Sequence, residues 1–121
     1  MNSKEAKENE RQLFEHVNNR DWEAVDRWVD EHIAEDYINH STAFDETPDR
    51  EGIKQMFRKG AELFPDMQLE IAEMVFEDDT MCFKFYTRQL GGGIGDLTGL
   101  CMVKYIDDKI IHRWAYSDVP K

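Results

Sequence analysis

The feature that most constrains the fold is a change of hydrophobic period near Pro65. Before Pro65 the apolar residues recur every three or four positions, as in helices, and after it they recur at nearly every second position, as in strands. A chain that places its helices before its strands does not alternate them as βαβ units do. The order therefore predicts an α+β fold, with helices covering one face of a curved antiparallel sheet.

Three helices are expected before Pro65, at residues 3–19, 21–33 and 47–64. The first is almost wholly polar until its end, so its first turns are expected to lie in solvent. Asp21 is placed to cap the second helix. Thr47 as a cap and Pro48 in the first turn are expected to open the third helix. The segment 35–46 between the second and third helices predicts a loop.

Four strands are expected after Pro65, at residues 68–77, 80–90, 97–106 and 109–117. The acidic stretches "EDD" and "DDK" between them favour tight hairpin turns. Apolar residues occupy both faces of this sheet, because Met81, Phe83 and Phe85 alternate with Cys82 and Tyr86. Helices on one face leave the other for a second subunit, which predicts a homodimer.

Length and charge limit the classes of partner. The 121 residues fit a single domain, 1–121, and 26 acidic against 15 basic residues give a net charge of -11. Such a surface repels phosphate backbones and anionic membranes, so neither nucleic acid nor a membrane is expected as a partner. The polar start "MNSKEAKENERQ" has no apolar signal core, and we expect a cytoplasmic protein.

The glycine-rich stretch from Gly91 to Gly99 contains five of the seven glycines. A phosphate-binding loop would lead into a helix, whereas this stretch leads into a strand pattern, so a flexible hairpin or pocket-rim loop is favoured. No metal site is expected, because the four histidines are scattered and Cys82 and Cys101 have no second thiol or histidine at ligand spacing. Buried free thiols are the simpler interpretation.

General acid and base chemistry remains, and two segments offer the side chains for it. Tyr37 and His40 follow the second helix, and Asp118 ends the alternating face of the last strand. Each has a structural alternative: Tyr37 as a core residue with a satisfied hydroxyl, His40 as a hydrogen-bonded and partly buried side chain, and Asp118 as an exposed carboxylate.

The order of these segments resembles a known family. "NNRDWEAVDRWVDEHIAEDYINH", a proline-led helix, "LFPDMQLEIAEMVFEDDTM" and "DDKIIHRWAYSD" are together similar to the SnoaL-like polyketide cyclase branch of the nuclear transport factor 2-like superfamily. The resemblance covers about residues 10–118. It implies a cystatin-like cone, open at one end to an apolar pocket for a small organic ligand, and a homodimer.

The resemblance also implies roles for particular residues. Asp118 matches the acid/base of the cyclases, which act without a cofactor, and His40 matches a histidine that positions a substrate oxygen. The expected substrate-binding walls are aromatic, namely Trp28, Tyr37, Phe57, Phe85 and Trp114. One departure is that relatives usually carry a "GTH"-like run where this chain has "TRQLGGGIGDLTG". Arg88 in that run is either an anion-binding group or an exposed strand arginine.

Two functions fit these features. One is a cofactor-independent enzyme of the cyclase, isomerase or dehydratase type, acting on a small, mostly apolar carbonyl or hydroxyl compound. The other is a non-catalytic module that binds a hydrophobic small molecule or pairs with a partner domain. Fold alone does not choose between them.

Overall fold

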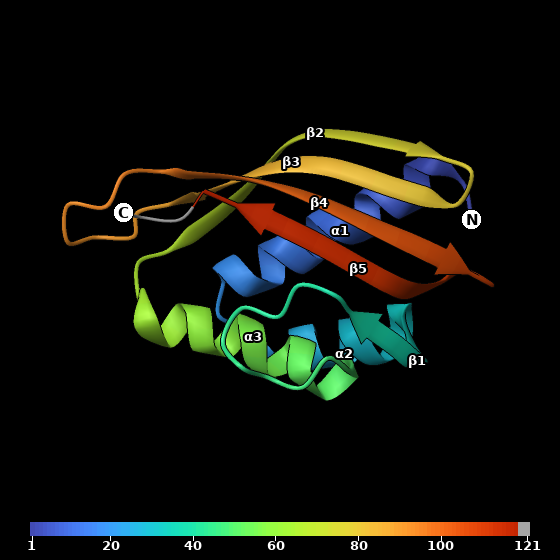
Figure 1. The fold of residues 1–121 in the computed structure, drawn as a ribbon, viewed down its shortest axis with the longest axis horizontal. Helices are drawn as coiled ribbons and strands as arrows, with labels where there is room; N and C mark the ends of the chain where they lie inside the picture. Colours follow the sequence, from blue (N-terminus) through green and yellow to red (C-terminus); the bar gives the residue numbers. More distant parts are fainter. Residues whose placement is uncertain (119–121) are drawn as a thin grey trace.

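The computed structural model describes residues 1–118 as helices packed on one curved, unclosed sheet, which confirms the α+β prediction (Figure 1). The helices are α1 (Ser3–Asn18), α2 (Trp22–His32) and α3 (Arg50–Leu63). The strands are β1 (Ile33–Asn39), β2 (Gln68–Glu77), β3 (Thr80–Arg88), β4 (Leu97–Ile106) and β5 (Lys109–Ser117). No helix within residues 1–118 is both long and apolar enough to cross a membrane.

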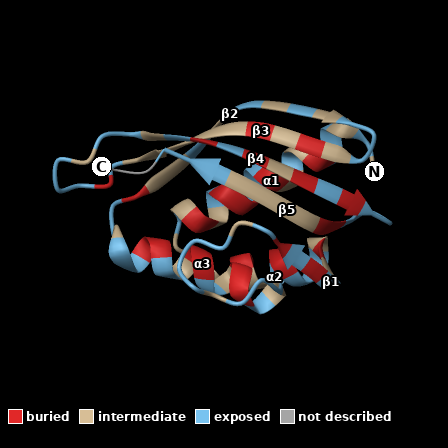
Figure 2. Cartoon of the chain, viewed as in Figure 1, coloured by how far each residue is buried: buried red, intermediate tan, exposed pale blue. Residues whose placement is uncertain are grey.

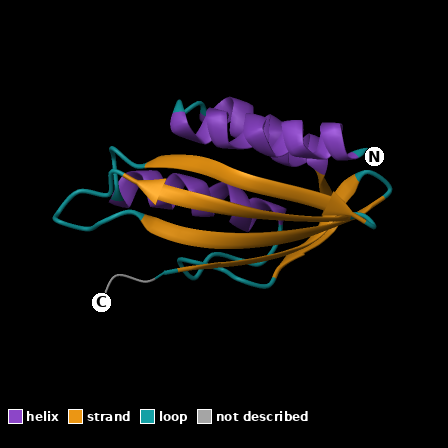
Figure 3. Cartoon of the chain, turned by 90° about the horizontal axis from the view of Figure 1, so that it is seen from above, coloured by secondary structure: helices purple, strands orange, loops and turns teal. Residues whose placement is uncertain are grey.

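The sheet has the strand order β1-β5-β4-β3-β2, and its helices gather on the concave side (Figure 3). Buried residues lie where those helices meet the strands (Figure 2). The strands β2 to β5 form an antiparallel meander, as predicted. Its first and last turns are two-residue turns, at Asp78–Asp79 and Asp107–Asp108, in which all four residues have positive φ. This backbone is the type I′ turn that matches strand twist.

The strand β1 lies in the segment for which a loop was expected. It pairs with β5 in parallel, with Ile33 opposite Ile110 and Asn39 opposite Arg113, and the register is irregular between them. Glu35 and Asp36 interrupt the apolar pattern, and both residue types are depleted in strands, so propensity gave no signal. The sheet is therefore mixed at this edge.

The start of α3 also differs from the prediction, because Asp49 caps it in place of Thr47. The Asp49 carboxylate accepts a hydrogen bond from the Gly52 N–H at 2.9 Å and one from the Thr47 hydroxyl at 2.7 Å. Pro48 lies before the helix, where its carbonyl accepts from the Asn39 N–H at 2.8 Å. Residues 47 and 48 therefore tie α3 to β1 rather than beginning the helix.

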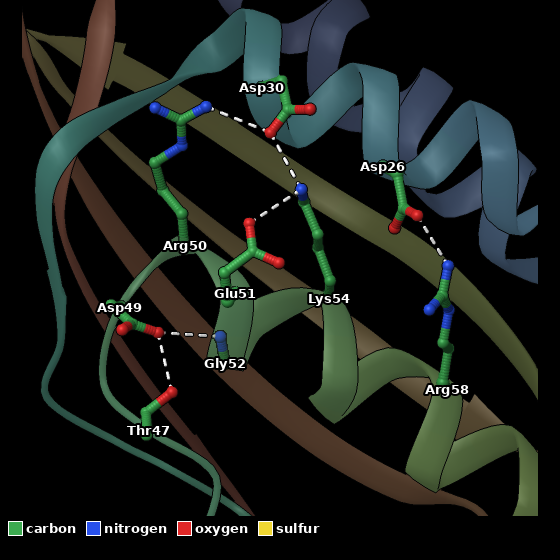
Figure 4. A network of polar contacts seen from close by, with 9 residues as sticks. All are labelled: Asp26, Asp30, Thr47, Asp49, Arg50, Glu51, Gly52, Lys54 and Arg58. Carbon is green, nitrogen blue, oxygen red and sulfur yellow. Dashed lines mark hydrogen bonds and ion pairs between the residues drawn. The ribbon is translucent and has the colours of Figure 1, made fainter.

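Ion pairs join α2 to α3 (Figure 4). Asp30 accepts from Arg50 at 3.0 Å and from Lys54 at 2.9 Å, and Asp26 pairs with Arg58 at 2.6 Å. Hydrogen bonds from Lys54 and Arg50 hold the pKa of Asp30 below its usual range. These contacts fix the position of α3, and the opposite face of α3 forms one wall of the pocket described next.

Candidate functional site

An apolar pocket of about 240 Å³ lies between α1, α3 and the concave face of the sheet. Its walls are mostly aromatic and aliphatic side chains, among them Phe14, Met56, Phe57, Phe64, Met67, Leu69, Phe83, Phe85, Leu90 and Leu97. This volume is slightly below the range typical of drug-sized ligands. It suits a compound of one or two rings.

The mouth of the pocket is more polar and lies toward the end of β5. Ser41, Thr87, Tyr116 and Ser117 contribute to its lining. The β3–β4 loop lies at the same end of the sheet (Figure 1), and Leu90 and Leu97 on its two sides line the pocket. The glycine-rich stretch therefore borders the rim, as predicted.

A second, smaller cavity of about 20 Å³ lies at the closed end of the cone. It shares Phe14, Phe57, Phe83 and Arg113 with the main pocket. Behind these shared residues it is lined by Glu10 and Tyr37, from α1 and β1. A cavity of this volume has room for one water molecule, and Glu10, Tyr37 and Arg113 are its polar lining groups. The closed end thus places a carboxyl group, a guanidinium and a phenol close to an apolar pocket.

Glu10 is the only buried acidic residue within the described part of the chain, with an exposed fraction of 3%. Burial raises the pKa of its carboxyl to about 7, because desolvation disfavours the charged form, while the positive charge of Arg113 opposes this shift. A carboxyl with a pKa near neutrality is able to both accept and donate a proton at physiological pH. This makes Glu10 a candidate acid/base group.

The sequence-predicted wall residues fall into three places. Phe57 and Phe85 line the main pocket, and Phe57 also lines the small cavity. Trp28 and Tyr37 line only the small cavity and are buried in the core. The Trp28 indole N–H donates to the Asn9 carbonyl at 2.8 Å, which fixes its ring between α1 and α2.

Trp114 and His40 lie on the other side of the sheet. Alternation along β5 directs Arg113 and Ala115 into the pocket and Trp114 to the outer face, where it lines a groove with Leu100. The His40 ring stacks on Trp114, with centroids 4.6 Å apart and planes 6° apart. His40 Nε2 also lies 3.1 Å from Nδ1 of His112. The side chain is hydrogen-bonded but exposed, so it matches the alternative of a hydrogen-bonded, partly buried histidine only in part.

Asp118 lies just beyond β5 and is exposed. Its N–H donates to the Thr98 carbonyl at 3.0 Å, and the preceding Tyr116 and Ser117 line the mouth of the pocket. The carboxylate is therefore near the rim but is not part of the pocket lining. The structure does not bring Asp118 and His40 together in one cavity, and the catalytic roles of both stay predictions.

Sequence reasoning missed Glu10 and Arg113. The first turns of α1 are not in solvent: its buried residues are Ala6, Glu10, Leu13, Phe14 and Val17. Glu10 occupies the position in this 3.6-residue pattern where an apolar residue is expected, and that spacing was the available signal. Arg113 lies on the inward side of β5 with Ala115, where alternation predicts burial.

The other candidate groups are satisfied or inert. Arg88 pairs with Glu70 at 2.7 Å and with Asp96 at 2.5 Å. Cys82 and Cys101 are free thiols, and burial raises the pKa of Cys101 to about 12. Over residues 1–118, His, Cys, Asp and Glu side chains form no group of three able to hold a metal ion.

The chain was compared with known families and structures. Residues 11–113 match the family model described as the SnoaL-like domain. No curated protein matches the sequence. IdmH from Streptomyces antibioticus, a proposed polyketide cyclase, is 23% identical with a TM-score of 0.70, over 93% of this chain and 91% of that chain. A loop-truncated variant of IdmH is 26% identical with a TM-score of 0.74 over the same shares.

Two further solved structures have the same fold. A proposed polyketide cyclase from Bacillus cereus has a TM-score of 0.78 and 16% identity, over 98% of this chain and 79% of that chain. A proposed isomerase of the SnoaL-like family from Agrobacterium tumefaciens has a TM-score of 0.76 and 16% identity, over 92% and 95%. At these identities the likeness shows the fold alone.

Proposed function

This chain belongs to the SnoaL-like domain family, and we propose that it is a cofactor-independent acid/base enzyme of the cyclase, isomerase or dehydratase type. Its substrate is a small, mostly apolar carbonyl or hydroxyl compound bound in the main pocket. The observation that carries this proposal is the buried carboxyl of Glu10 at the closed end of the cone, whose pKa of about 7 suits it to proton transfer.

The chemistry follows from the groups at the closed end. Glu10, as a carboxylate, takes a proton from a carbon next to the substrate carbonyl; the C–H electron pair becomes an enolate. The guanidinium of Arg113 lines the same small cavity, and its positive charge favours anionic groups bound near it. Protonated Glu10 then returns the proton to another carbon, or to a hydroxyl group that leaves as water.

The carboxyl of Glu10 and a substrate in the main pocket are separated by the wall that the two cavities share. Glu10 lines the small cavity and not the main pocket, so its proton passes directly at the shared wall or through one water molecule. The small cavity, about 20 Å³, has room for that water. The predicted acid/base role of Asp118 enters the same test, whereas His40 stacks on Trp114 at the outer face of the sheet and its predicted role stays a prediction.

Exchange of carbon-bound protons tests this function without knowledge of the natural substrate. We expect the protein to accelerate the exchange of α-protons of 1-indanone or 2-tetralone with D2O, followed by proton NMR, because a base beside a carbonyl carbon catalyses that exchange. Glu10→Gln should lower the rate at least tenfold, since the amide accepts no proton. Asp118→Asn should lower it as well if the predicted rim role holds.

Glu15→Gln is the matched control, because Glu15 lies in the same helix and is exposed. It should exchange at the wild-type rate. Equal rates for wild type and Glu10→Gln, with both folded and both binding the ketone, would contradict the assignment of Glu10.

One observation favours the binding module as a second candidate. The lining of the main pocket, among the described residues, contains no carboxylate and no imidazole. A protein that binds the ketone but leaves its exchange rate at the buffer value, in wild type and in every variant, is a binding module.

A further inference from the structure

Arg113 is a partly buried cation without an anionic partner. Its Nη1 atom is inaccessible to solvent and has no hydrogen-bond partner in the described chain. No carboxylate oxygen of residues 1–118 lies within ion-pair distance of its guanidinium. A desolvated charge that has no ion-pair partner, and one donor atom without a hydrogen bond, carries a desolvation cost.

The contrast with Arg88 shows that this state is specific to Arg113. Arg88 also lies on the sheet, next to the rim loop, and binds two carboxylates, those of Glu70 and Asp96. The folded chain therefore satisfies one of these two guanidinium groups internally and leaves the other facing a pocket. The chain has 26 acidic residues, so the absence of a partner for Arg113 does not reflect a shortage of acids.

The groups that face Arg113 do not neutralise it. Three titratable side chains approach it from neighbouring elements: Glu10 from α1, Tyr37 from β1 and Cys101 from β4. Burial raises the pKa of both Tyr37 and Cys101, which therefore stay neutral at physiological pH. Glu10 has a pKa of about 7, so its charge only partly balances the guanidinium at neutral pH and hardly at all at pH 6.

Arg113 lines both the main pocket and the small cavity, and it is the only cationic side chain in the described lining of either. A guanidinium presents its N–H groups as a planar fork that matches a carboxylate in two parallel hydrogen bonds. One cation in an otherwise apolar pocket suits one negative charge on an otherwise apolar molecule.

We propose that Arg113 binds a carboxylate of the ligand, so that the natural substrate is a small one- or two-ring carboxylic acid. This deepens the proposed function and rests on the main pocket being its site, but it concerns recognition and not proton transfer. The carboxylate takes the place of the missing ion-pair partner at the closed end, and the rings fill the aromatic walls toward the mouth.

The test compares two ligands of similar shape by isothermal titration calorimetry: 2-naphthoate and the neutral 2-acetylnaphthalene. At pH 6 we expect the wild type to bind 2-naphthoate at least tenfold more tightly than the ketone, and the preference to shrink at pH 8 as Glu10 ionises. Arg113→Met keeps a long, unbranched side chain but removes its charge. It should bring the two affinities within about threefold of each other, while the ketone still binds.

Arg88→Met is the control, and it should keep the full preference for 2-naphthoate. Retained binding of the ketone by Arg113→Met shows that its pocket is intact. If that variant does not fold, Arg113→Lys replaces it, because a lysine keeps the charge without the planar fork and should lower the preference without abolishing it.

Equal affinities for the two ligands in the wild type, or a preference that survives in Arg113→Met, would overturn the proposal. These outcomes are distinct from failure of the proposed function. An anion preference without proton exchange leaves Arg113 as the anchor of a binding module, and proton exchange without an anion preference leaves the enzyme without this anchor.

Discussion

At the scale of single residues, Glu10 makes the stability of the protein depend on pH. The pKa of its carboxyl rises from 4.5 in the unfolded chain to about 7 in the fold, so between these values the folded state holds a proton that the unfolded state has lost. The free energy of unfolding therefore falls as pH rises from 4.5 to 7, by about 3 kcal/mol, and is level above that range.

Urea unfolding at several pH values measures this dependence. The contribution should disappear in Glu10→Gln, which is also expected to be more stable than the wild type at pH 8, because its amide carries no charge to bury. Glu15→Gln should keep the wild-type slope. A slope between pH 4.5 and 7 that is the same in Glu10→Gln and in the wild type would show that Glu10 titrates normally.

Gly99 leaves the space that the Phe85 ring occupies in the pocket wall. It lies opposite Phe85 in the β3–β4 pair, and a Cβ atom at Gly99 would lie 2.3 Å from the Phe85 ring. Gly99→Ala should therefore push the ring into the pocket, lower the free energy of unfolding by about 1–3 kcal/mol and weaken ligand binding. Thermal unfolding and calorimetry measure the two effects.

A second substitution tests whether Gly99→Ala destabilises the protein through a clash with the Phe85 ring. Phe85→Leu should rescue part of the stability lost in Gly99→Ala, because the smaller side chain leaves room for the methyl group. Gly95→Ala should be nearly neutral, since a Cβ there meets nothing within 4 Å. Additive losses in the double variant would argue against the contact with Phe85.

The residues of the site were only partly predictable from sequence. Phe57 and Phe85, two of the expected wall residues, line the main pocket, and their role in substrate binding stays a prediction. Glu10 and Arg113 were not proposed as site residues, because charged side chains are usually exposed and a sequence pattern does not show which of them are buried. Trp114 was expected in the pocket wall but lines the outer groove. The alternation along β5 shows which residues share a face, but it does not show which face the helices cover.

At the scale of elements, the turn between β2 and β3 carries local strain. Asp78 and Asp79 have φ of 52° and 55°, a region that asparagine and glycine adopt at lower cost. Replacing the pair with Asn-Gly should raise the free energy of unfolding by about 1 kcal/mol, measured in urea.

A glycine at an exposed strand position gives the control for this turn. Asp36→Gly, within β1, should lower the free energy of unfolding by about 0.5–1 kcal/mol, because glycine loses more conformational freedom there. If the Asn-Gly turn were destabilising too, the positive φ values would not be a source of strain.

The elements themselves were predicted more successfully than the site. The 3.6-residue and two-residue hydrophobic periods predicted the bounds of α1, α2 and the four strands of the meander to within a few residues. The strand β1 was missed because its hydrogen bonds come from β5, more than seventy residues later, and two acids mask its pattern. The start of α3 was displaced because Pro48 bonds to β1 before the helix begins and Thr47 bonds to the Asp49 cap.

At the scale of the whole molecule, the outer face of the sheet is the predicted dimer surface. Its groove includes Val75, Leu100 and Tyr116, which are 64%, 62% and 69% exposed. We expect light scattering at micromolar concentration to give twice the chain mass of 14.3 kDa, since exposed apolar surface of this kind favours association. A lysine in the groove, as in Leu100→Lys, should shift the protein to the monomer.

The matched control is Ile106→Lys, because Ile106 is 60% exposed on the same strand but does not line the groove. It should remain dimeric. A wild-type mass near 14.3 kDa would contradict the dimer, and a Leu100→Lys dimer would place the interface elsewhere.

The central claim is that a carboxyl at the closed end of the pocket is ready for proton transfer at neutral pH and senses what the pocket binds. The most direct measurement is a carbon-13 NMR titration of the Glu10 side-chain carboxyl, assigned by comparison with Glu10→Gln, with and without 2-naphthoate. We expect a midpoint near pH 7 that rises when the anion binds to Arg113. A midpoint near 4.5 that ignores the ligand would contradict both the acid/base role of Glu10 and its coupling to the pocket.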